Sequence, residues 1–173
     1  MWLNEWVVTS ATYKIYPLSN GGTVQNADLL FASAQVGDVF QIFQDLKEND
    51  YLHPSVLAAI AAIVFSPEVG EATVLVNLTY AGPVDKFSYL VQPFLDLKPI
   101  VQVVQTLPSN KTTQLAAFGV DSLTRVKGHP RSMFGANVKK IDVATWNDVF
   151  DKTNALSNTT LLPLAAGVSL KSA

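Results

Sequence analysis

The order of hydrophobic patterns along the chain predicts an α+β fold, an antiparallel or mixed β-sheet with helices packed on one face. Segments with the alternating pattern of strands are interleaved with segments whose apolar residues recur at helical spacing. Two of the strand segments are joined by a short loop that is typical of a hairpin. No repeat or low-complexity linker divides the 173 residues, which fit one domain, or one domain and a fragment.

The composition limits the functions that the chain can have. Hydrophobic residues make up 49% of the sequence and charged residues only 15%, against an average of about 25% charged. This low charge suggests that part of the surface normally faces a partner domain or subunit. The net charge of −2, with no basic stripe, excludes a nucleic-acid-binding surface. The lack of cysteine excludes disulfides, zinc–thiolate sites and cysteine nucleophiles.

The strongest strand signal lies near the start of the chain, in Trp6–Pro17 (WVVTSATYKIYP). β-Branched and aromatic residues fill this segment, and Pro17 ends it. Alternate residues of the segment form two sets, and one set is more apolar than the other. This pattern predicts a strand with one buried face. The segment begins soon after Met1, with nothing before it to pair with. It therefore pairs with later segments only, or a part that belongs in front of it is missing from this sequence.

A short strand is predicted over Asp28–Ala34 and a helix over Gly37–Lys47. The apolar residues of the helix recur at i, i+3, i+4 and i+7, which places them on one face. Asp38 lies near its start and Lys47 in its last turn, and both charges suit the helix macrodipole.

The next apolar run, Val56–Phe65, is ambiguous because its alanines favour a helix. Prolines bracket it tightly, and the segment that follows, Ala72–Tyr80, alternates clearly. A five-residue loop, Ser66–Gly70, separates the two runs, with proline early and glycine late. We therefore predict a β-hairpin.

The second half of the chain predicts helices that alternate with strands. The first helix is expected to turn Phe87, Leu90, Val91 and either Phe94 or Leu95 inward, and Pro93 should kink or end it. The expected elements are a helix over Val84–Leu97, a strand over Pro99–Leu107, a small helix over Asn110–Gly119 capped by Gly119, a polar loop over Val120–Pro130, a strand over Arg131–Ile141 and a helix over Trp146–Leu156. No full strand is expected in Leu161–Ala173.

The sequence shows no self-contained catalytic apparatus. It has no glycine-rich phosphate loop and no serine in a strand-to-helix elbow. His53 and His129 each precede a proline in a loop, with no metal-ligand spacing around them. The carboxylates are scattered, and the pair Lys139-Lys140 is typical of a solvated strand edge.

Two features bear on the compartment. The ten-residue run Val56–Phe65 is about half the length of a membrane span, and no signal peptide is visible at the N-terminus. Three sequons occur, at Asn77, Asn110 and Asn158. Chance explains them best, since Asn77 lies in the middle of a predicted strand. If they are used, the export signal belonged to a lost N-terminus.

The first segment resembles the one that closes the FAD domain in FAD-linked oxidases. These are the berberine-bridge-enzyme-like group of the vanillyl-alcohol-oxidase superfamily, with its PCMH-type FAD-binding domain. Asn4 and Val7-Val8-Thr9 match the end of that domain, although Glu5-Trp6 stands where Phe-Gly is expected and the glycine-rich run is absent. Later matches are Ser66-Pro67-Glu68, Tyr80-Ala81-Gly82-Pro83, Leu90–Leu97, Pro99, Ala117-Phe118-Gly119-Val120-Asp121, Lys127-Gly128 and Ala136-Asn137-Val138-Lys139-Lys140-Ile141-Asp142-Val143.

The resemblance implies that the chain is a substrate-binding cap domain whose sheet lies over the flavin. Residues 1–17 would be the remnant of the closing strand, residues 18–160 the cap domain, and residues 161–173 a divergent tail. Val7, Val8 and Thr9 would contact FAD. We expect Tyr80, Asn137 and Lys139 to line the substrate pocket.

The chemistry implied is oxidation of a small organic or carbohydrate substrate, with hydride transfer to FAD and O2 as the acceptor. The flavin attachment and the pyrophosphate loop belong to a domain that this sequence does not show, and no catalytic residue is implied within it. The chain alone is therefore expected to be inactive, as a truncated or degenerate relative. Full-length members of the family are secreted. The alternatives are a stand-alone α+β small-molecule binder and a non-catalytic partner that caps another subunit.

Overall fold

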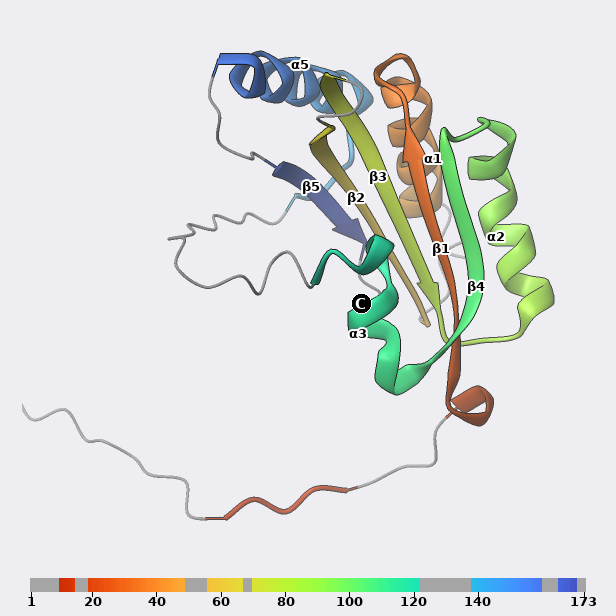
Figure 1. Cartoon of the computed structure of the whole chain (residues 1–173). Coiled ribbons are helices and arrows are strands. Elements are labelled where there is room, and N and C mark those ends of the chain that lie inside the picture. The colour runs from red at the N-terminus through yellow and green to blue at the C-terminus, as the bar shows by residue number, and fades with distance from the viewer. Residues whose placement is uncertain are drawn as a thin grey trace, which may run out of the picture.

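A computed structural model describes residues 10–14, 19–48, 56–66, 70–121, 138–159 and 165–170. This part of the chain forms a five-stranded antiparallel sheet in the order β4-β1-β3-β2-β5, with helices, as Figure 1 shows. The α+β prediction is confirmed. The strands are β1 (Thr23–Phe31), β2 (Leu57–Ser66), β3 (Glu71–Tyr80), β4 (Val101–Pro108) and β5 (Ala165–Leu170), and the helices are α1 (Val36–Glu48), α2 (Val84–Asp96), α3 (Thr112–Leu115) and α5 (Val143–Thr159).

The predicted hairpin is β2 and β3, which pair antiparallel from Leu57 opposite Tyr80 to Ser66 opposite Glu71. The alanines of β2 alternate between buried and exposed positions, so the run follows the period of a strand despite its helix propensity. Pairing with β3 on one side and β5 on the other outweighs that propensity. Proline brackets and an alternating neighbour were therefore better guides than alanine content.

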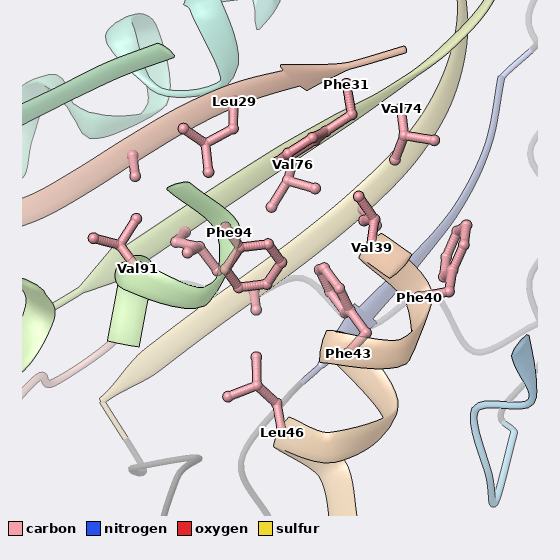
Figure 2. Packing of buried hydrophobic residues seen from close by; sticks show 14 of the residues in the cluster. Leu29, Phe31, Val39, Phe40, Phe43, Leu46, Val74, Val76, Val91 and Phe94 are labelled. Carbon is pink, nitrogen blue, oxygen red and sulfur yellow. The ribbon is translucent and has the colours of Figure 1, made fainter. Parts of the chain in front are cut away.

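The long helices α1, α2 and α5 cover one face of the sheet, and the short α3 lies on the other side (Figure 1). Phenylalanines of α1 and α2 meet over the sheet, where the rings of Phe43 and Phe94 pack edge to face with centroids 5.7 Å apart. Phe40 stacks on Trp146 of α5 at 4.9 Å. Figure 2 shows Phe40, Phe43 and Phe94 together with Leu29, Phe31 and two valines of β3, Val74 and Val76.

The predicted inward face of α2 is confirmed, with Phe94 rather than Leu95 fully buried. Pro93 does not end this helix, which continues to Asp96. The small helix predicted over Asn110–Gly119 is instead broken into α3 and two 3-10 turns, Ser109–Lys111 and Ala117–Gly119. Gly119, at φ +70°, closes the second turn and does not cap α3.

Three strand predictions need correction. Residues 10–14 are exposed and outside any strand, while the rest of Trp6–Pro17 lies outside the described residues. Residues 138–141 are not a strand, and 131–137 are likewise outside the described residues. Residues 165–170, for which no full strand was expected, form β5 on β2. Small residues such as those of β5 carry little strand propensity, so the partner strand decides.

In the described residues, no helix is both long and apolar enough to cross a membrane.

Asp142 caps the N-terminus of α5. Its carboxylate accepts hydrogen bonds from the hydroxyl of Thr145 at 2.6 Å and from the Thr145 amide at 2.9 Å. These two bonds, with a smaller contribution from the charge of Lys140, hold the pKa of Asp142 below its ordinary value. The stability that this cap contributes is present above the ordinary pKa and is lost as the pH falls through the lowered one.

We expect Phe43→Ala to lower the free energy of unfolding by about 3–5 kcal/mol, because the substitution leaves a cavity between α1, α2 and the sheet. Urea denaturation measures the change. Tyr89→Ala is the control, since Tyr89 on α2 is 70% exposed, and it should change stability by less than about 0.5 kcal/mol. Equal losses in the two variants would contradict the packing described above.

The cap of α5 is tested by an NMR titration of the Asp142 carboxyl carbon. We expect its pKa to lie below the ordinary value and to rise toward that value in Thr145→Ala, which removes the hydroxyl donor. Thr113→Ala, an exposed change in α3, is the control. An unchanged Asp142 pKa in Thr145→Ala would show that the hydroxyl bond does not lower it.

Candidate functional site

The candidate site is the sheet face turned away from α1, α2 and α5, which we call the open face. The pairing register places Asp28 of β1 between Asn77 of β3 and Val103 of β4. Two residues away on β1, Asn26 lies between Thr79 of β3 and Gln105 of β4. Because directly paired residues point to the same side of a sheet, this register gathers polar side chains at the centre of the open face.

These polar side chains form one buried network. The amide nitrogen of Asn77 donates to Oδ1 of Asp28 at 2.7 Å and to Oδ1 of Asn26 at 2.9 Å. The hydroxyl of Thr79 lies 3.3 Å from the side-chain oxygens of both asparagines. Asn26, Asp28 and Asn77 are each at most 5% exposed. The network therefore links the two central strands through side chains as well as through the backbone.

A turn from the far half of the chain covers the network. The backbone amides of Ala117 and Phe118 donate to the two carboxylate oxygens of Asp28, at 2.8 and 3.1 Å. Ala117, Phe118 and Gly119 all have φ between +54° and +70°, a conformation that side-chain-bearing residues rarely adopt. Hydrogen bonds to a charged acceptor are stronger than neutral ones, and they offset this strain.

The network contains one unpaired donor. Nδ2 of Asn26 is buried and has no hydrogen-bond partner among the described residues. A buried donor left without a partner costs about 1–3 kcal/mol. The hydrogen bonds of the other network atoms must therefore offset this cost.

Apolar side chains surround the network and are exposed. On the sheet, Ile60 pairs with Asn77, Val103 with Asp28 and Val101 with Leu30, so all three lie on the open face. In the covering segment, Leu115, Phe118 and Val120 are also exposed. These six residues are between 37% and 46% exposed. The open face thus offers apolar contact area around a polar centre in which the carboxylate of Asp28 is already engaged.

The open face is suited to binding and orienting a ligand. Both oxygens of Asp28 accept hydrogen bonds from the chain itself. Among the described residues, no three His, Asp or Glu side chains lie close enough together to hold a metal ion. His53 and His129 are outside those residues.

Of the site residues predicted from the sequence, only Tyr80 and Lys139 belong to the part of the chain that the structure describes. Val7, Val8, Thr9 and Asn137 lie outside the described residues. Tyr80 is 3% exposed and belongs to the core, where its ring stacks on Phe87.

Tyr80 has the same parity as Val76 and Leu78, which face the helices, so the register turns it away from the open face. A side chain at Gly82 would clash with the Tyr80 ring, which shows how tightly the chain closes over it. The structure gives Tyr80 a packing role, and we do not carry it forward as a substrate-binding residue.

Lys139 is exposed in the segment that precedes α5. Its neighbour Lys140 places its ammonium 3.9 Å from the carboxylate of Glu48, the last residue of α1, so this segment lies beside the helical layer. Lys139 therefore does not line the described part of the open face.

Asn26 and Asp28 were not among the residues predicted from the sequence, although a signal was present. In TVQNADLLF these two polar residues alternate with Ala27 and Leu29. Such alternation predicts a strand that begins before Asp28 and carries polar residues on one face. The turn at Ala117–Gly119 gave no comparable signal, because nothing in the sequence pairs it with a strand 89 residues away.

Comparison with known proteins gives several fungal relatives. The FAD-linked oxidoreductase fogF of Aspergillus ruber is 29% identical over 158 residues, which are 90% of this chain and 31% of the relative. The FAD-linked oxidoreductase azaG of Aspergillus niger is 29% identical over 152 residues, and OXR1 of Pyricularia oryzae is 26% identical over 149 residues.

The chain is similar to FAD-linked oxidoreductases of fungi. It spans about a third of the length of these relatives, between 28% and 32%. No protein-family model matches the chain. No solved structure matches it either.

We expect Asn77→Ala to lower the free energy of unfolding by about 1–3 kcal/mol, because the variant leaves carboxylate and amide oxygens of the network without their donor. Thermal and urea denaturation measure the loss. Asn110→Ala is the matched control, since Asn110 is exposed in a turn, and it should change stability by less than about 0.5 kcal/mol. If both variants have the stability of the parent chain, the network does not stabilise the fold.

Proposed function

We propose that the chain is the substrate-binding part of a flavin-dependent oxidoreductase of the berberine-bridge-enzyme-like group. The observation that carries the proposal is the similarity to FAD-linked oxidoreductases, which runs through 86–90% of this chain but only a third of each relative. An α+β unit whose long helices cover one face of the sheet, and whose other face carries exposed apolar side chains among the described residues, fits a domain that lies over a cofactor held elsewhere.

In this proposal the open face lies against the flavin ring and the substrate. Bound FAD would accept a hydride from a small organic or carbohydrate substrate and pass the electrons to O2. The residues of this chain would bind and orient the substrate and exclude water. Exposed Ile60, Val101 and Val103 fit a flat, largely apolar ring, and the carboxylate of Asp28, which pairs in register with Val103, is engaged within the network.

The domain limits follow from the same proposal. Residues 18–160 would be the substrate-binding domain and residues 1–17 the strand that closes the FAD domain. The tail, residues 161–173, contains β5, which pairs with β2. We therefore assign residues 165–170 to the sheet of the substrate-binding domain. Contact of Val7, Val8 and Thr9 with FAD, and secretion of the full-length protein, stay predictions.

A stand-alone small-molecule binder is the second candidate. It is favoured by the core of the described residues, in which side chains of three helices pack against the sheet within this one chain. Such a binder would use the same open face but would need no flavin domain. A non-catalytic partner that caps another subunit would likewise use this face.

A chimera tests the proposal. Replacing the matching segment of the Aspergillus ruber relative by this chain should give a protein that keeps its flavin absorbance. In the chimera, Val103→Lys should raise the quenching of flavin fluorescence by iodide, because a charged side chain on the open face would disrupt its contact with the flavin ring. Tyr89→Lys, on the far side of the molecule, is the matched control and should leave the quenching unchanged.

The unmodified relative serves as the reference for flavin content. A chimera that folds and holds flavin, but in which Val103→Lys and Tyr89→Lys quench alike, would contradict an open face that lies over the flavin. Tight, flavin-independent ligand binding by the chain, together with that result, would favour the stand-alone binder.

A further inference from the structure

Strand β4 forms one edge of the sheet. Among the described residues it pairs with β1 only, and it is the outermost strand on that side (Figure 1). In an edge strand, the backbone N–H and C=O groups of alternate residues point away from the sheet. Such a row of donors and acceptors is the surface to which a further strand adds.

Apolar side chains are exposed on both sides of this edge. Val101 and Val103 lie on the open face. Val104 pairs with the core residue Ala27, so it lies on the helix side of the sheet, yet it is 50% exposed. Ile100, just before the strand, is 52% exposed, and its amide donates to the carbonyl of Leu30 on β1 at 2.7 Å.

The position of these side chains indicates what could cover them. A domain that lies against the open face could contact Val101 and Val103, but Val104 is on the opposite side of the sheet. A strand added beside β4 would contact the side chains on both sides, because successive residues of a strand point to opposite faces. The exposed residues therefore fit an added strand better than a domain packed on one face.

The edge also lacks two common protections against pairing. Edge strands of natural proteins are often protected by lysine or proline. The sequence of β4 from Val101 to Leu107, VQVVQTL, contains neither a charged residue nor a proline, and Pro108 stands only at its end. The edge therefore fits a strand that is itself apolar and uncharged.

This description fits β4 of a second copy. The residues Ile100-Val101-Gln102-Val103-Val104 have the same order of apolar and polar side chains when read from either end. When two copies of the segment pair antiparallel about a two-fold axis at Gln102, Val101 of one copy lies opposite Val103 of the other. Ile100 then lies opposite Val104. Residues directly opposite each other share a face and are close enough to pack, at about 5 Å.

The axis at Gln102 is favoured over the neighbouring registers. Moving it by one residue, to Val101 or to Val103, places one of the apolar residues opposite a glutamine. With the axis at Gln102, Lys98 lies opposite Thr106, so no charge faces a like charge. The segment is thus complementary to itself in shape, polarity and charge.

We propose that β4 pairs with β4 of a second copy about a two-fold axis at Gln102, so that one continuous sheet runs through a dimer. The same edge is used by both copies, so the association closes at two chains. The added strand lies beside the sheet and leaves the open face uncovered. The pairing is therefore independent of the function proposed above.

Sedimentation of the purified chain tests the dimer. We expect the mass of two chains, and Val104→Lys should raise the dissociation constant at least about tenfold, because it places an ammonium group opposite Ile100 of the second copy. Val104 lies on the helix side, so this change does not touch the open face. Val138→Lys is the matched control, since Val138 is an exposed valine in the segment that precedes α5, and it should leave the dimer unchanged.

Single cysteines test the register, because the natural sequence has none. Gln102→Cys places one thiol from each copy at the axis, where the two Cα atoms fall within the range of about 4.4–6.8 Å that a disulfide spans. Mild oxidation should therefore link the two chains. In Val104→Cys the two thiols are four residues apart along the paired strands, about 13 Å. This variant is the control and should link at least about tenfold more slowly.

A chain that stays monomeric up to about 1 mM would overturn the proposal. So would a dimer that Val104→Lys leaves intact, an open-ended assembly in place of a dimer, or equal rates of linking in the two cysteine variants. If Val104→Lys does not fold by circular dichroism, the cysteine pair alone decides. Loss of the pairing would leave the flavin chimera and its result unaffected, and failure of the chimera would leave the pairing.

Discussion

The carboxylate of Asp28 is the group on which the form of the open face depends. It lies at the centre of the sheet, where an unpaired charge would cost several kcal/mol. Asn77 supplies one donor from the neighbouring strand, and Ala117 and Phe118 supply two more from a turn. Because a buried charge must be satisfied, these bonds hold the turn against the sheet.

Local pattern was enough to predict the helical layer. Helix α1 was predicted over Gly37–Lys47 and spans Val36–Glu48, since its apolar spacing and its terminal charges agree. The same holds for α2, whose buried face is the one that the spacing predicts. The hairpin of β2 and β3 was also predicted, because its loop chemistry and the alternation of β3 outweighed the alanines of β2. In each of these elements the information lies within about fifteen consecutive residues.

Where pairing between distant segments decides, the sequence was a poor guide. The strand β5 is made of small residues and forms because β2 offers an edge. The strand expected to end at Ile141 is absent over residues 138–141, where the chain instead leads Ile141 into the core beside α5. An alternation of apolar and polar residues predicts a strand, but the same alternation is compatible with a loop that buries only one of its residues.

The site was harder to predict than the fold for a related reason. Tyr80 was expected to bind substrate, and strand parity places it with Val74, Val76 and Leu78 in the core. Asn26 and Asp28 could have been found from the alternation in β1, whereas the turn that covers them could not. A carboxylate and two amides separated by about ninety residues share no sequence motif, and only the folded chain brings them together.

The buried position of Asn77 has a consequence for biosynthesis. Its side-chain nitrogen is the atom to which an oligosaccharide would be joined, and that atom is the shared donor of Asp28 and Asn26. A glycan on Asn77 and the folded sheet are therefore mutually exclusive. In a secretory compartment, the pairing of β1 with β3 and the glycosylating enzyme would compete for the side-chain nitrogen of Asn77. A chain glycosylated at Asn77 would therefore be a chain that had not folded.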